Sequence, residues 1–286
     1  MTWNEELRAL LDDRRHSSTD LFQRFVELCD RMVTAGVSAE GLRKSAHQLA
    51  QAHPAMGLFW HLQQRFESLY RSNAVPQDFL EAAHTLVQRV RQHTEAAAHA
   101  TAAHLPNGTT ILTHSSSSHV RLVLQYASGL GKRFQLLCTV SEPGREGVQL
   151  ARWAYAQGFP VTLLAEAQVG AFVPEIHLFL VGSDALCTDG VLHKIGTALL
   201  AYHLWLEHRP VWVVSCGEKA VPLRWSTELA GTAPRLCRWR LPQAQPLYDC
   251  TPWEYVSLLF TEQGMEDPTA FRNRFLGMHP APLSEP

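Results

Sequence analysis

The chain has 286 residues, a length that suits two domains or one large one. Its 25 basic and 27 acidic residues give a formal net charge of −2, so it lacks the positive excess of a dedicated nucleic-acid binder, and we do not expect nucleic acid as a partner. Hydrophobic residues make up 46% of the chain, an ordinary globular share that excludes wholesale disorder, collagen and a disulfide-stapled miniprotein.

The N-terminal part of the sequence has a helical pattern. Apolar residues recur at helical spacing in 21–33, 56–70 and 79–104, and the last segment is rich in alanine. Pro106, Asn107 and Gly108 follow it and end the pattern, because proline and glycine stop helices. We therefore predict a helical N-terminal domain over residues 1–104, without strands.

From residue 105 the pattern alternates between short apolar runs and amphipathic segments. It predicts an α/β fold, in which a Rossmann-like parallel sheet over 105–286 carries helices on both faces. A last helix is expected over 248–264, where Thr251 would cap it, Pro252 would take its first position and Glu254 would complete a capping box. The other strands are expected at 109–114, 133–140, 159–166, 176–184 and 210–216, and the helices at 119–131, 147–158, 169–175 and 194–209.

Ligands of such sheets bind at the carboxyl ends of the strands, which here lead into four loops: 114–118, 139–147, 182–194 and 215–220. The first loop joins a strand to a helix and contains His114 and the four serines Ser115, Ser116, Ser117 and Ser118. Free backbone N–H groups and the helix dipole favour an anion at such a place, which predicts a phosphate or sugar cradle. In the alternative interpretation, one serine caps the helix and the others are solvated.

Two further loops carry charged candidates. An apolar strand delivers Asp184 to its carboxyl end, and the chain returns with His193 and Lys194 at an expected helix start, where a cation is unfavourable unless an anion shares the site. This favours Asp184 as a proton- or hydroxyl-handling group and Lys194 as a phosphate ligand; alternatively, Asp184 caps a turn and Lys194 is solvated. Arg145 is the one cation of the loop 139–147, and either reaches a phosphate or is a solvated arginine.

Cysteine and histidine placement gives no metal site. No two cysteines form a CxxC pair and each lies in or beside an apolar run, which predicts reduced core thiols in a cytoplasmic protein: Cys29, Cys138, Cys187, Cys216, Cys237 and Cys250. His93, His99 and His104 lack the i, i+4 spacing of a helical metal pair. The N-terminus is not a signal peptide, and no apolar run is long enough for a membrane span. We therefore expect no metal, no cofactor and no membrane partner.

Four stretches together resemble the eukaryotic initiation factor 2B alpha/beta/delta superfamily, which includes methylthioribose-1-phosphate isomerase and ribose-1,5-bisphosphate isomerase. They are ILTHSSS at 111–117, GVQLARWAYAQGFPVTLL at 147–164, LVGSDAL…DGVLHKIGT at 180–197 and YDCTPWEYVSLLFTEQG at 248–264. The resemblance implies a helical domain, a Rossmann-like domain and a homodimer or larger homo-oligomer. It also implies that Asp184 is the aspartate that moves protons in the isomerases and that Lys194 is their substrate lysine.

The sequence departs from the isomerase pattern at several of these positions. Ser115 stands where the isomerases have their catalytic cysteine, and a hydroxyl is a much weaker acid than a thiol. Glu142 replaces an arginine expected to bind phosphate, His193 replaces the substrate asparagine, and His53 stands where the isomerases tend to have arginine.

Two functions remain open on this basis. The first is a pocket that binds a phosphorylated pentose or a nucleotide, with aldose–ketose isomerisation as its possible reaction. If it catalyses, we expect Asp184 to be partly desolvated, with a raised pKa, and Ser115 to be its catalytic neighbour. The second is a non-catalytic regulatory or assembly subunit of the initiation factor 2B type, acting through protein–protein contacts.

Overall fold

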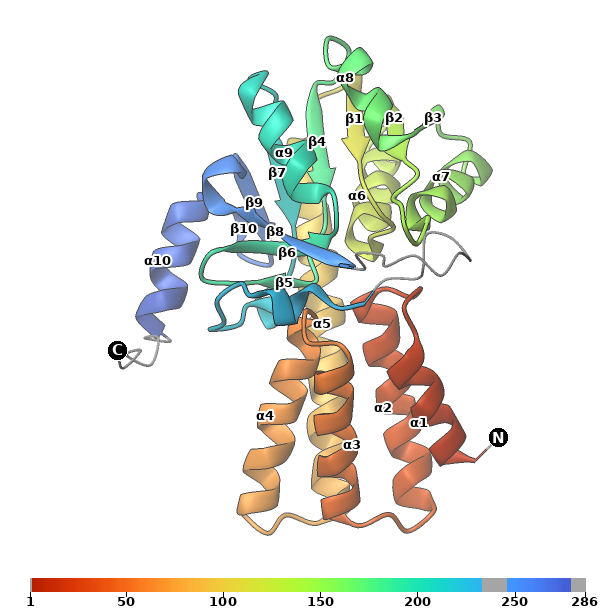
Figure 1. Ribbon diagram of the computed structural model, residues 1–286, viewed down its shortest axis with the longest axis vertical. Coiled ribbons are helices and arrows are strands. Elements are labelled where there is room, and N and C mark those ends of the chain that lie inside the picture. Colours follow the sequence, from red (N-terminus) through yellow and green to blue (C-terminus); the bar gives the residue numbers. More distant parts are fainter. Residues whose placement is uncertain (1, 233–245, 279–286) are drawn as a thin grey trace, which may run out of the picture.

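The N-terminal part is a bundle of five helices in the computed structural model, which describes residues 2–232 and 246–278 (Figure 1). Thr2, Ser17 and Ser38 cap the first three helices with their hydroxyl groups. Phenylalanines from different helices form the centre of its core. The predicted all-helical N-terminal part is thus confirmed, and its helices are α1 (Trp3–Asp12), α2 (Ser18–Thr34), α3 (Ala39–Ala52), α4 (Gly57–Arg71) and α5 (Pro76–His104).

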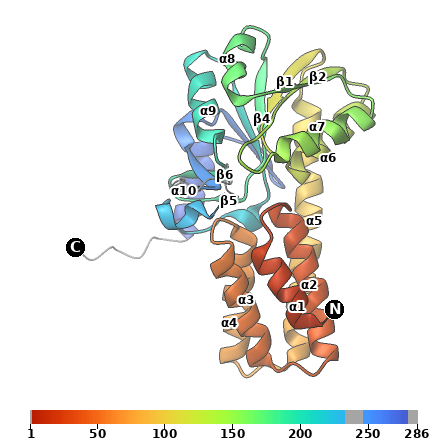
Figure 2. The same ribbon diagram turned by 45° about the vertical axis from the view of Figure 1, so that its right-hand side comes forward.

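A seven-stranded sheet lies above the bundle, with the strand order β10-β9-β7-β4-β1-β2-β3. All neighbouring pairs are parallel except β9 and β10. The strands are β1 (Thr109–Thr113), β2 (Phe134–Thr139), β3 (Val161–Leu164), β4 (Leu178–Val181), β7 (Val211–Val214), β9 (Leu258–Thr261) and β10 (Gly264–Glu266). The carboxyl ends of β1, β4 and β7 therefore meet at one edge of the sheet, which faces the bundle (Figures 1 and 2).

Helices cover both faces of this sheet, as the apolar alternation predicts. One face packs against the C-terminal half of α5, against α6 (Ser118–Gly129) and against α7 (Glu146–Ala156). The other packs against α8 (Val169–Phe172), α9 (Thr197–Leu206) and α10 (Pro268–Met278). The single helix α5 runs from the bundle to the sheet, which ties the two parts together (Figure 2).

A second, three-stranded sheet corrects two sequence predictions. Strand β6 (Gly190–Lys194) pairs antiparallel with β5 (Ala185–Leu186) and with β8 (Tyr248–Pro252). Lys194 is therefore the last residue of a strand and not the start of a helix, and α9 begins three residues later. All five residues of β6 are buried, and this burial between two strands outweighs the helical pattern that follows.

The helix expected over 248–264 is wrong. The segment forms β8, a short 3-10 turn at Trp253–Tyr255, and then β9 and β10. The Thr-Pro-x-Glu cap signal is local, whereas β8 completes the small sheet and β9 adds a parallel partner to β7. The apolar run in 258–261 is four residues long, which suits a buried strand better than a helix.

The described cysteines are all unpaired, and none of the described helices could span a membrane. Cys29, Cys138, Cys187, Cys216 and Cys250 are free thiols, whereas Cys237 lies outside the described residues. Within residues 2–232 and 246–278, no helix has both the length and the apolar character needed to cross a membrane.

Candidate functional site

A cavity with an open volume of about 50 Å³ lies where the carboxyl ends of β1, β4 and β7 meet the helical bundle. Predicted site residues line it together with residues of the α1–α2 loop. The predicted ones are Ser115, Ser116, Ser117, Ser118, Asp184, His193 and Lys194, and the further ones are Arg14, Arg15, His16, Ser17, Ser18, Glu146, Ser183, Lys219, Leu247 and Tyr248. Four of the lining side chains are lysine or arginine and two are carboxylates, so the wall carries an excess of positive charge.

The serine loop adopts a conformation that few non-glycine residues take. Ser115 has a φ of 69°, in the left-handed region, and its N–H donates to the hydroxyl of Ser141 over 2.7 Å. Ser117 is the N-cap of α6 and accepts from the N–H of Val120 over 3.4 Å. A Cβ at Gly182 would come within 2.1 Å of the Ser117 hydroxyl oxygen, so the glycine lets the end of β4 approach the start of α6.

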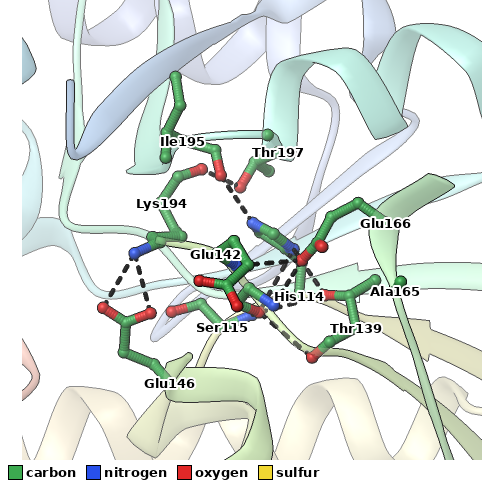
Figure 3. A network of polar contacts seen from close by, with 12 residues as sticks. His114, Ser115, Thr139, Glu142, Glu146, Ala165, Glu166, Lys194, Ile195 and Thr197 are labelled. Atoms are coloured by element: carbon green, nitrogen blue, oxygen red, sulfur yellow. Dashed lines mark hydrogen bonds and ion pairs between the residues drawn. The ribbon is translucent and has the colours of Figure 1, made fainter. Parts of the chain in front are cut away.

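His114 is directed away from the cavity and does not line it. Its Nε2 donates to the carbonyl of Ile195 over 2.8 Å, and its Nδ1 accepts from the hydroxyl of Thr139 over 2.6 Å (Figure 3). Burial lowers the pKa of His114 to about 3, so the ring is neutral. With both ring nitrogens bonded to protein atoms, His114 joins the end of β1 to the loop before α9.

Asp184 lies in the cavity wall with His193 beside it. The Nδ1 atom of His193 is 3.5 Å from an oxygen of Asp184, while its Nε2 atom is buried and has no hydrogen-bond partner within the described chain. Burial alone raises the pKa of Asp184, but His193, Lys219 and Ser18 together lower it below its ordinary value. The expected rise in this pKa is therefore wrong, because its neighbours stabilise the ionised form.

Lys194 is buried and forms an ion pair with Glu146, in the first turn of α7. Its Nζ atom is 2.9 Å from one carboxylate oxygen and 2.8 Å from the other (Figure 3). The interpretation of Lys194 as a solvated side chain is thus excluded. Glu146 was not predicted, although it lies in the loop 139–147 that the strand-end rule indicates.

Arg145 is not brought to the cavity. Its side chain is 66% exposed and pairs with Glu142 over 3.4 Å at the surface. Its φ of 63° places it in the left-handed region immediately before α7. The chain therefore turns there so that Glu146, and not Arg145, enters the cavity wall.

Lys219 is a cavity residue that the sequence pattern did not single out. It lies in the 3-10 turn Gly217–Lys219 after β7, is 2% exposed, and donates to the carbonyl of Ser183 over 2.6 Å. Among the described residues no carboxylate lies within 4.0 Å of its Nζ, although its charge reaches Asp184 over a longer distance and lowers the pKa of that carboxyl group. Lys219 is the one cation of the strand-end loop 215–220, so the rule that directed attention to these loops could have identified it from the sequence.

The α1–α2 loop was also missed. Asp13 holds this loop by accepting from the N–H groups of Arg15 and His16 over 2.9 and 3.1 Å. Burial raises the pKa of Asp13, but these hydrogen bonds and the His16 side chain outweigh it and lower the pKa to about 2. Arg14, Arg15 and His16 are a basic cluster in the sequence, but no strand-end rule applies to a loop between helices.

His93, Glu218 and Glu262 form a group outside the cavity whose side chains are of the types that bind metals. His93 Nδ1 donates to Glu218 over 2.9 Å and lies 3.9 Å from Glu262. Arg89 binds the same Glu218 over 3.0 Å. Arg89 therefore already neutralises Glu218, the most buried carboxylate of the group. These contacts link α5 to the turn that follows β7.

The chain matches the Initiation factor 2 subunit family over residues 5–268. It is a member of this family. The resemblance drawn from the sequence motifs is thereby confirmed.

Two relatives and one solved structure illustrate the family. A protein of Pyrococcus horikoshii, named as a putative translation initiation factor eIF-2B subunit 2-like, is 28% identical over 230 residues, which are 80% of this chain and 82% of that protein. The methylthioribose-1-phosphate isomerase of Albidiferax ferrireducens is 28% identical over 268 residues, 82% of this chain and 75% of that enzyme. A crystal structure of the Pyrococcus horikoshii OT3 initiation factor eIF-2B has a TM-score of 0.83 and 26% identity, covering 94% of this chain and 98% of that one.

Proposed function

We propose that this family member binds the phosphate group of a phosphorylated pentose or a nucleotide in the cavity between the sheet and the bundle. The observation that carries the proposal is Lys219, a buried cation at the cavity wall that has no carboxylate within 4.0 Å in the described chain and acts on Asp184 only from a longer distance. A buried charge is costly unless it is paired, and a bound anion would pair it. The serines at the start of α6 line the same cavity, as does His193, whose Nε2 has no hydrogen-bond partner in the described chain.

Binding is better supported than turnover. The lowered pKa of Asp184 makes its carboxylate a weak base, and the hydroxyl of Ser115 is a poor proton donor at neutral pH. The named isomerase activity belongs to relatives such as the Albidiferax ferrireducens enzyme. In the proposed site Asp184 orients sugar hydroxyls, and it remains the group placed to move a proton if the bound sugar is isomerised.

Isothermal titration calorimetry with ribose 5-phosphate, a nucleoside monophosphate and unphosphorylated ribose tests the proposal. We expect at least one phosphorylated compound to bind with a Kd below about 1 mM and ribose to bind far more weakly. Lys219→Met should weaken phosphate binding about tenfold or more, because it removes a charge-assisted hydrogen bond. NMR spectra of the same mixtures test turnover, which Asp184→Asn would abolish.

Arg145→Gln is the matched control. Arg145 is exposed and outside the cavity, so its loss should change the Kd by less than about twofold. No binding of any phosphorylated compound to the wild-type protein would defeat the proposal. Equal losses in both variants would show that general positive charge, and not the cavity, attracts phosphate.

A second function, assembly with another copy of this chain, is favoured by the surface of α9. The helix is apolar around its circumference: Leu200 and Leu204 are buried against the sheet, while Leu199, Tyr202, Trp205 and Leu206 are between 44% and 70% exposed. A helix that is apolar on all sides is normally buried on all sides. We propose that this face is an interface between identical subunits.

A further inference from the structure

The Lys194–Glu146 ion pair places a protein carboxylate where the proposed phosphate would bind. Lys194 is 3% exposed, and both oxygens of Glu146 lie within 2.9 Å of its Nζ. A carboxylate and a phosphate are both oxyanions and compete for the same ammonium group. Because Glu146 takes two of the three N–H donors of Lys194 and neutralises its charge, a phosphate gains little from this lysine while the carboxylate remains there (Figure 3).

A glycine provides the space in which the Glu146 carboxylate sits. A Cβ on Gly144 would come within 2.1 Å of a carboxylate oxygen of Glu146 and 2.6 Å of its carboxyl carbon. No side chain other than hydrogen is compatible with this position of the carboxylate. The loop before α7 is therefore shaped to receive the Glu146 carboxylate beside Lys194.

The backbone beside Glu146 is tightly packed, whereas its side chain faces the cavity. A Cβ on the next residue, Gly147, would come within 1.9 Å of the carbonyl oxygen of Thr139, so the start of α7 packs directly on the end of β2. The start of α7 therefore cannot move closer to β2. The Glu146 side chain lines the cavity, so rotation about its own bonds is the movement by which its carboxylate could leave Lys194.

We propose that Glu146 is a built-in competitor of the phosphate: its carboxylate holds Lys194 until a phosphate monoester displaces it by rotation of the Glu146 side chain. This inference rests on the proposed function, because it concerns the same cavity. It also explains why the open volume of about 50 Å³ has room for only a few water molecules, since the carboxylate fills part of the subsite. Displacement makes the affinity depend on how well the ligand replaces a carboxylate, which favours doubly charged phosphate over neutral sugars.

Two variants release Lys194 in different ways. Glu146→Gln removes the negative charge but keeps the size of the side chain, and Gly144→Ala keeps the charge but pushes the carboxylate away from Lys194. Calorimetric titration with inorganic phosphate and with ribose 5-phosphate should give a Kd about tenfold or more tighter for Glu146→Gln. Gly144→Ala should tighten the Kd by about threefold or more.

Glu142→Gln is the control for charge alone. Glu142 lies in the same loop, but it is 50% exposed and pairs with Arg145 outside the cavity. At physiological ionic strength its loss should change the phosphate Kd by less than about twofold, because exposed charges are screened.

Thermal unfolding gives a second measurement. Removing one partner of a buried pair leaves the other charge uncompensated, so Glu146→Gln should melt below the wild-type protein in phosphate-free buffer. Phosphate should then raise its Tm by more than it raises the wild-type Tm. If Glu146→Gln does not fold, Gly144→Ala decides the question, because it retains both charges.

The outcomes separate this inference from the proposed function. Binding by the wild-type protein that becomes tighter in both variants supports the displacement. Wild-type binding that neither variant improves overturns the role of Glu146 and leaves the phosphate site intact. Absence of phosphate binding in all proteins overturns both.

Discussion

Asp249 is a buried carboxylate that lies outside the cavity and joins β8 to α9. It accepts from the N–H of Gly196 over 2.7 Å and of Ala198 over 3.2 Å. Burial raises the pKa of Asp249 to about 6, although these hydrogen bonds and His193 oppose the rise. The folded protein therefore holds a proton on Asp249 over a pH range in which the unfolded chain has lost it.

This pKa predicts a pH-dependent stability. Because the native state binds more protons here than the unfolded state, the contribution of Asp249 is fully present below about pH 4 and is lost as the pH rises through about 6. Asp249→Asn should remove this loss. The difference in unfolding free energy between variant and wild type should grow in favour of the variant by on the order of 2–3 kcal/mol from pH 4 to pH 7.

Urea unfolding at several pH values measures this difference. Other groups, Asp13 among them, also make stability depend on pH, but they contribute equally to both proteins and cancel. Parallel stability curves for variant and wild type would contradict the raised pKa.

The start of α4 packs against the turn that carries Lys219 and thereby positions this residue. The N–H of Gly57, the first residue of α4, donates to the carbonyl of Asp184 over 3.0 Å. No side chain caps α4, so a strand-end loop takes over that role. A Cβ on Gly57 would come within 2.5 Å of the carbonyl oxygen of Lys219.

Gly57→Ala should therefore push α4 away from the turn that carries Lys219. The methyl group meets backbone, which cannot rotate aside, so we expect a loss of about 1–3 kcal/mol of stability and weaker phosphate binding. Denaturant unfolding and calorimetry measure the two effects.

Gly129→Ala is the control, because it adds the same methyl group at a glycine without close neighbours. Gly129 ends α6, and a Cβ placed there would meet nothing within 4 Å beyond its own helix and chain neighbours, so alanine should be neutral or slightly stabilising. Equal effects at Gly57 and Gly129 would contradict the assigned role of the close approach.

At the scale of the whole molecule, the apolar face of α9 is the feature that points beyond a single chain. Tyr202 and Trp205 contact Tyr255, with ring centroids 5.4 and 5.3 Å from it, and extend the patch beyond the helix. The patch exposes on the order of 400 Å² of apolar surface, if a fully covered aromatic side chain buries about 150–250 Å². This is close to the apolar share of one side of an interface of roughly 800 Å² per partner, which suits a second copy of the chain.

Leu199→Asp should convert the expected dimer to monomer. Leu199 is 70% exposed, so the substitution leaves the core intact, but it would place an unpaired charge in the interface. Analytical ultracentrifugation at micromolar concentration measures the change. Leu130→Asp, at a leucine that is 51% exposed in the turn after α6, should leave the mass unchanged.

Either of two results would count against the interface. A wild-type protein that is monomeric at these concentrations contradicts it. So does a dimer that tolerates Leu199→Asp but is broken by Leu130→Asp.

The pattern of apolar residues was enough to predict the helical N-terminal part, the mostly parallel sheet with helices on both faces, and the strand ends at which the cavity lies. These follow from local information, because the spacing of apolar residues reports the secondary structure and the edge of a sheet. Ser117 and Asp184 were found in this way, since each closely follows an apolar strand. Lys219 lay within an indicated loop and was overlooked.

The remaining features depend on contacts between segments that are distant in the sequence. The tertiary structure turned the capped segment at 248–264 into strands, because pairing with β6 and β7 outweighs a local cap signal. It brought the α1–α2 loop over the sheet and paired Lys194 with Glu146, 48 positions apart in the chain. It also fixed the ionisation of Asp184, since the pKa of a buried carboxylate depends on the charges and hydrogen bonds around it, and those neighbours come from segments that only the fold brings together.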